Sequence, residues 1–401
     1  MKYAFICLLS LVSSCMGLDE GDPIPMDRLY APASMLKNGD TLYVVNANLD
    51  LRYKTGSVLG INVSDTTAAK VTETAKIPSQ GGILAASSDF ESIFVTSQQL
   101  GSLNSLKPEQ QLDLGQNGPY FLSLVPNQQA GFIGYLLTFA SELIDDGRFS
   151  VTGNQGELQY FTWAPGQPPQ VKQTFKISSC FKAQAYQRTA RLGGLLINNG
   201  NLFALAEIIV TPGYRPQKRV FLVKAAVSDL QQGNLNQTTC KTVDLTQGEN
   251  GGVQSLAQAG RGLAVSTDGN TVYALLDENP TVLRLGFGSD GAVSQTAKVE
   301  TCRSPVQIRL SPDEKTVLVA CDKSHQLIAY NAPNLGVIGK FQGGTTSERN
   351  DLGPVDILFD PLKPSQVFVS FQGSHQIGIF NYANTTSSQS FDFVSRLKLS
   401  R

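Results

Sequence analysis

His325 and His375 are the only histidines of the 401-residue chain, and each lies in a Ser-His-Gln triplet. Because histidine titrates near neutral pH, a pair on one surface could act as general acid and base or bind a metal ion. Both triplets, however, occupy the same place in two copies of a longer repeat, Ser304–Asn331 and Gly353–Asn381. Duplication of the repeat therefore explains the coincidence without a functional site, and we favour that interpretation.

The repeat predicts the fold. Each copy opens with a small residue and proline, alternates apolar residues through one strand, turns at a proline and continues into two further strands. Similar inner strands start near residues 32, 82, 119, 193, 262, 305 and 354. This pattern predicts an all-β fold, a seven-bladed β-propeller of four-stranded antiparallel blades. The long intervals after 119 and 193 leave an eighth blade as the alternative.

The C-terminal segment should complete the ring. Residues 390–399 are strand-like and follow the third strand of the last blade, so we expect them to form its outermost strand. The ring then closes by packing of blade seven against blade one, or else by an exchanged strand near Arg28.

Composition and charge argue against several classes of protein. Hydrophobic residues make up 41% of the chain, and 37 glycines and 19 prolines suit many short strands joined by tight turns. The formal net charge is −1 and there is no lysine- or arginine-rich run, so we expect no nucleic-acid binding. The chain has no GxSxG, HExxH, P-loop or CxxC motif. We therefore expect no metal and no cofactor.

The N-terminus predicts export. An apolar run from Ala4 to Val12 is too short to span a bilayer, and the Val-Ser-Ser-Cys sequence that ends at Cys15 resembles the lipobox of bacterial lipoproteins. A lipidated Cys15 would make the membrane a partner of the chain. We expect the bacterial outer membrane, because Met16 rather than aspartate follows the cysteine, as enteric-type sorting to that membrane favours. The alternative is an ordinary secretory peptide. We expect a signal peptide over residues 1–14, a lipidated N-terminus and flexible tether over 15–27, and a monomeric propeller over 28–401.

Outside the signal region remain four cysteines, an even number, which predict disulfides in an exported chain. Cys302 precedes the innermost strand of one blade and Cys321 ends the next strand, so an antiparallel hairpin would bring them together. Cys180 and Cys240, in the outer parts of the third and fourth blades, form the expected second pair. Zinc is the alternative, but the histidines are not near a cysteine pair.

One face of the propeller should collect polar side chains. The loops between second and third strands share this face with the connections between blades, and convergent polar groups at a concavity are the default hypothesis for a site. Every propeller also has a solvated rim, which is the alternative. Besides the two histidines, the face should carry Asp50, Arg52, Tyr53, Tyr214, Arg215, Glu278, Asp322 and Lys323, with Arg191, Arg261 and Arg303 near the starts of inner strands.

Three segments are similar to a known family. Residues 42–63, 317–341 and 367–384 resemble YVTN-type repeats of seven-bladed propellers, a family that includes exported bacterial proteins and lactonase-like enzymes. The resemblance implies the fold and leaves the activity open. We expect a non-enzymatic lipoprotein of the bacterial envelope that binds a protein or saccharide ligand. The alternative is a lactonase-like hydrolase of the same fold.

Overall fold

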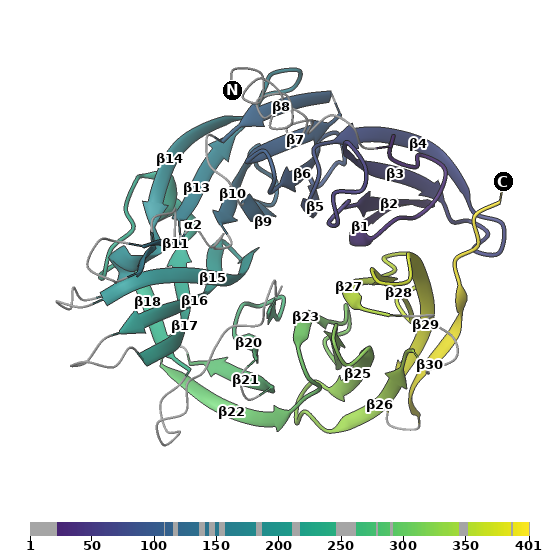
Figure 1. Ribbon diagram of the computed structural model, residues 1–401. Coiled ribbons are helices and arrows are strands. Elements are labelled where there is room, and N and C mark those ends of the chain that lie inside the picture. The colour runs from purple at the N-terminus through teal and green to yellow at the C-terminus, as the bar shows by residue number, and fades with distance from the viewer. Residues whose placement is uncertain are drawn as a thin grey trace, which may run out of the picture.

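Seven four-stranded antiparallel sheets surround a common axis (Figure 1). The structure is a computed structural model and describes residues 22–107, 109–114, 119–135, 141–143, 149–151, 157–181, 187–210, 217–245, 262–277, 280–288, 292–344, 352–385 and 388–400. The predicted seven-bladed propeller is thereby confirmed. Within the described part of the chain, the long interval after residue 119 holds an inserted hairpin of blade three rather than an eighth blade.

The first four blades run from the N-terminal side of the chain. Their strands are β1 (Pro32–Asn38), β2 (Thr41–Asn46), β3 (Gly56–Asn62) and β4 (Lys70–Ile77); β5 (Gly81–Ala86), β6 (Ile93–Ser97), β7 (Ser102–Leu106) and β8 (Glu109–Asp113); β9 (Pro119–Leu124), β10 (Ala130–Tyr135), β13 (Glu157–Thr162) and β14 (Gln170–Lys176), with the inserted hairpin β11 (Ser141–Leu143) and β12 (Phe149–Val151); and β15 (Gln187–Asn198), β16 (Asn201–Val210), β17 (Gln217–Ala226) and β18 (Cys240–Asp244).

The last three blades complete the ring. Their strands are β19 (Leu263–Val265), β20 (Thr271–Leu276), β21 (Thr281–Phe287) and β22 (Val293–Glu300); β23 (Pro305–Leu310), β24 (Thr316–Cys321), β25 (Gln326–Asn331) and β26 (Val337–Gln342); and β27 (Pro354–Phe359), β28 (Gln366–Phe371), β29 (Gln376–Asn384) and β30 (Gln389–Arg396). Two short helices, η2 (Ile177–Cys180) and α2 (Val227–Gln231), belong to the outer parts of blades three and four.

The position of a strand within its blade determines its burial. All six residues of β24, a second strand, are buried, because both faces of a middle strand contact neighbouring blades. The outermost strand β8 instead alternates exposed and half-buried residues. The hydrophobic core therefore lies between the blades, as the Val-rich second strands predict.

Blade seven packs directly on blade one. The predicted last strand is β30, which pairs with β29, and each of the seven sheets is built from strands of one continuous segment. Met35, Leu42, Phe368 and Leu397 share one buried cluster across the junction. Closure by packing is therefore confirmed, and no strand near Arg28 is exchanged among the described strands.

After β30 the chain continues across to blade one. The Ala69 N–H donates to the Lys398 carbonyl at 2.9 Å, and the Ser400 N–H donates to the Ala69 carbonyl at 2.8 Å. On the same junction, Lys37 Nζ and Asp360 Oδ1 form a buried ion pair at 2.9 Å. The two ends of the ring are thus joined by apolar packing, backbone hydrogen bonds and one ion pair.

Both predicted disulfides are present. Cys302 and Cys321 lie 6.0 Å apart at their Cα atoms and tie the entry of β23 to the end of β24. Cys180, at the end of η2, is bonded to Cys240, the first residue of β18, with Cα atoms 5.4 Å apart. The Cys302–Cys321 disulfide lies within blade six, whereas the Cys180–Cys240 disulfide joins blades three and four.

The N-terminal predictions fall largely outside the described residues, which begin at residue 22 and so exclude Cys15. Within residues 22–27, Ile24 is buried in a small cluster with Tyr30 and Tyr53. No helix in the described ranges has the length and apolar character needed to cross a membrane.

Candidate functional site

A cavity of about 310 Å³ opens at the end of the ring where the inner strands begin. We call it the loop-face mouth. The starts of inner strands contribute Ala33, Gly81, Tyr120, Ser304, Val306 and Val355, and the loops between second and third strands contribute Leu49, Gln98, Asp322, Lys323 and Gln372. Two of the predicted face residues, Asp322 and Lys323, therefore line a real concavity.

Asp322 is held at the mouth by its neighbours in blades six and seven. Its N–H donates to the Ser304 carbonyl at 3.0 Å, which fixes the loop after β24. A Cβ at position 353 would lie 2.7 Å from Asp322 Oδ1, and Gly353 has φ +67°, so this position requires glycine. Burial raises the pKa of the Asp322 carboxyl, although the nearby Lys323 ammonium lowers it.

The two histidines make the same contact at two junctions. His325 Nδ1 accepts a hydrogen bond of 3.1 Å from the Gly353 N–H, just before β27. His375 Nδ1 accepts one of 2.9 Å from the Ala31 N–H, just before β1. Each ring therefore ties its own blade to the innermost strand of the next. An Nδ1 that accepts a hydrogen bond carries no proton, so both contacts require a neutral imidazole.

His375 also belongs to a cluster around Tyr30 that sequence reasoning missed. The Tyr30 ring stacks on His375 with centroids 4.5 Å apart, and its hydroxyl donates to Asp50 Oδ2 at 2.6 Å. Tyr53 meets Tyr30 edge-on at 4.7 Å, and the Arg52 guanidinium lies 5.7 Å from the Tyr53 ring centroid. We call these five residues the Tyr30 cluster. It brings together four predicted face residues at the junction of blades seven and one.

Electrostatics within the Tyr30 cluster stabilise neutral Tyr30 and ionised Asp50. Burial and the hydrogen bond to Asp50 raise the pKa of Tyr30 to about 12. The same hydrogen bond lowers the pKa of the Asp50 carboxyl. Burial also lowers the pKa of His375, against the attraction of Asp50. At neutral pH the cluster therefore holds a phenol, a carboxylate and a neutral imidazole in fixed contact.

Of the remaining predicted residues, only Arg303 has a side chain that the structure describes. Tyr214, Arg215, Arg261 and Glu278 lie outside the described residues, and Arg191 lies in β15. Arg303 is exposed beside the mouth. Within the described ranges, no three His, Cys, Asp or Glu side chains gather closely enough to hold a metal ion.

A second cavity, of about 470 Å³, occupies the opposite end of the axis. We call it the channel cavity. Inner strands from all seven blades line it, and their side chains are mainly leucine, isoleucine, alanine and phenylalanine. Arg309 is the one charged residue among the described residues of its lining.

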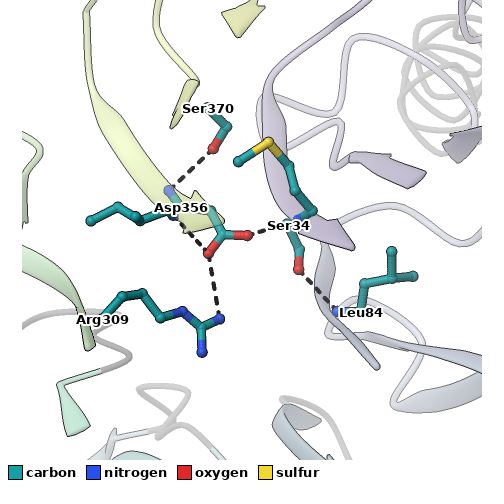
Figure 2. A network of polar contacts seen from close by, with 7 residues as sticks. Ser34, Leu84, Arg309, Asp356 and Ser370 are labelled. Carbon is teal, nitrogen blue, oxygen red and sulfur yellow. Dashed lines mark hydrogen bonds and ion pairs between the residues drawn. The ribbon is translucent and has the colours of Figure 1, made fainter. Parts of the chain in front are cut away.

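Figure 2 shows the polar network beside the channel cavity, in which Asp356 of β27 joins three blades. Its Oδ2 accepts a hydrogen bond of 2.7 Å from the Met35 N–H of blade one, and its Oδ1 lies 3.8 Å from Arg309 of blade six. Ser34 Oγ accepts a hydrogen bond of 3.0 Å from the Leu84 N–H of blade two. Buried acceptors thus link successive inner strands around this part of the ring.

Comparison with known proteins identifies the class of fold. No family model and no curated protein matches the sequence. A candidate 6-phosphogluconolactonase from Bacteroides fragilis is similar in structure, with a TM-score of 0.57, 13% identity and coverage of 94% of this chain and 98% of that one. A similar candidate enzyme from Bacteroides uniformis has a TM-score of 0.56 and 14% identity, with 93% and 96% covered. The Cps50 (Swd1) β-propeller domain of Myceliophteria thermophila has a TM-score of 0.60 and 10% identity, with 89% and 98% covered. The chain is a seven-bladed β-propeller, and at these identities the likeness concerns the fold alone.

Proposed function

We propose that this chain is an exported propeller lipoprotein of the YVTN type that binds a protein or saccharide ligand at the loop-face mouth. One observation carries the proposal: a carboxyl, an ammonium and two amides, from Asp322, Lys323, Gln98 and Gln372, line one cavity together with the Tyr120 side chain. Convergent polar groups in a concavity fix the orientation of a ligand.

The chemistry of the mouth suits a ligand rich in hydroxyl or amide groups. Glutamine offers both donors and acceptors, and an aromatic ring supplies a flat apolar surface. A volume of about 310 Å³ is at the lower end of small-molecule sites, so one sugar ring or one or two side chains of a protein would fill it. The two disulfides support export, because such bonds persist in oxidising compartments.

Binding can be tested on a saccharide array and by crosslinking to envelope proteins. We expect Asp322→Asn to weaken ligand binding about tenfold or more, since a hydrogen bond to a charged group contributes about 1.5–3 kcal/mol. Asp392→Asn is the matched control, because Asp392 is an exposed carboxylate on the outermost strand β30. Equal binding by the native protein and Asp322→Asn would contradict the proposed site.

A lactonase-like hydrolase is the second candidate function. It is favoured by the position of Asp322 at the cavity wall, where burial raises the pKa of its carboxyl, because a carboxyl with a raised pKa in a cavity is a candidate general acid. Turnover of sugar or acyl lactones by the purified protein, abolished in Asp322→Asn and kept in Asp392→Asn, would establish this candidate in place of the binding module.

A further inference from the structure

We propose that the channel cavity binds an amphiphilic carboxylate, an apolar chain with a single anionic head, with Arg309 as the residue that recognises the head. This site lies at the opposite end of the axis from the loop-face mouth, and it takes a different class of ligand. The proposal goes beyond the proposed function and does not depend on it.

The lining favours an apolar chain. Leu36, Leu124, Leu196, Leu310 and Leu358 come from five different blades, and each is only half-buried although it lies in the interior of the ring. An apolar chain that covers these leucines removes their surface from water, and this favours binding. A volume of about 470 Å³ is within the range of small-molecule sites, which are mostly apolar with a few placed polar groups.

The charge of Arg309 determines which head group of the ligand the channel cavity binds. The Arg309 side chain is 39% exposed, whereas the Asp356 side chain beside it is fully buried. Asp356 is held by the Met35 N–H at 2.7 Å and by the Ile357 N–H at 3.0 Å, so its negative charge is stabilised by backbone donors as well as by the guanidinium. Arginine presents five N–H donors in a planar fork that fits a carboxylate.

The position of Arg309 gives the ligand its orientation. Arg309 is the fifth residue of β23, and its neighbour Leu310, with Pro312 beyond the strand, lies farther toward the end of the channel. Met35 and Ile357 line the cavity beside the Arg309–Asp356 pair. A carboxylate bound to Arg309 would therefore place its apolar chain among the leucines of the other blades.

The test uses decanoate and decanol, which share an apolar chain and differ in the head, with titration calorimetry on the full chain. We expect decanoate to bind more tightly than decanol. Arg309→Gln should weaken decanoate binding about tenfold and leave decanol within about twofold, because only the charge-assisted contact is lost. Ala85→Phe, which adds a large side chain to the lining of the cavity, should weaken binding of both compounds.

Arg303→Gln is the matched control, since Arg303 is an exposed arginine at the other end of the same blade. Thermal melting of each variant checks that the ring is intact, and Ala85→Phe keeps the test decisive if Arg309→Gln fails to fold. Failure of the native protein to bind decanoate, equal affinity for both compounds, or undiminished binding by Ala85→Phe would overturn the proposal. Loss of saccharide or protein binding at the mouth would leave it standing.

Discussion

Removing residues 390–401 should open the junction between blades seven and one. The deletion takes away most of β30, which pairs with β29, and the segment that hydrogen-bonds to Ala69 of blade one. It also removes two buried side chains, Phe391 and Leu397, which are 7% and 8% exposed. The edge of β29 would then face solvent without a partner.

The expected loss of stability follows from the two buried side chains that the deletion removes. Burying one such side chain contributes about 1.5–3 kcal/mol, so the two together stabilise the ring by about 3–6 kcal/mol. The entropy of unfolding is roughly 2 cal/mol/K per residue, or about 0.8 kcal/mol/K for a chain of this length. The melting temperature should therefore fall by about 4–7 °C, before the lost hydrogen bonds are counted.

Circular dichroism melts, with size-exclusion chromatography to detect association through the open edge, measure this effect. Phe391→Ala should reproduce much of the loss, whereas Val394→Ala on the same strand should melt within a degree or two of the native protein, because Val394 is 51% exposed. If the truncated chain melted cooperatively at the native temperature and stayed monomeric, the C-terminal strand would contribute nothing to closure.

Three further changes have definite expected outcomes. Cys15→Ser should release the protein from membranes and abolish labelling by fatty acid, and unchanged retention would contradict lipidation. Cys302→Ala with Cys321→Ala should lower the free energy of unfolding by about 2–4 kcal/mol in denaturant titrations, and no change would mean that the bridge adds nothing. The pKa of His375 is lower in the folded protein than that of an ordinary histidine. The contribution of His375 to the free energy of unfolding is therefore complete above the ordinary histidine pKa, and it is lost as the pH falls through the pKa of the folded state. His375→Gln should therefore lose less stability than the native protein on acidification below about pH 6.5. Identical dependence of stability on pH in the two proteins would refute the claim that the contact requires a neutral His375.

Local pattern was sufficient to predict the blades. Alternating apolar residues and turn residues are properties of short segments, so the two repeats that contain His325 and His375 predicted the strand order of a blade. The seven starts of inner strands predicted the number of blades, with an eighth blade as the alternative. The bridge between Cys302 and Cys321 was predictable for the same reason, because both cysteines belong to one hairpin.

Only the tertiary structure decided which side chains meet. His375 accepts its hydrogen bond from Ala31, 344 residues away, and Tyr30 joins them although it stands just before the first inner strand and has no repeat partner that marks it. Arg309 faces a cavity whose walls come from seven separate segments. The sequence determined the fold because strand and turn preferences are local. The contacts at the mouth, the Tyr30 cluster and the channel cavity depend on the closure of the ring, which brings distant blades within a few ångströms of each other.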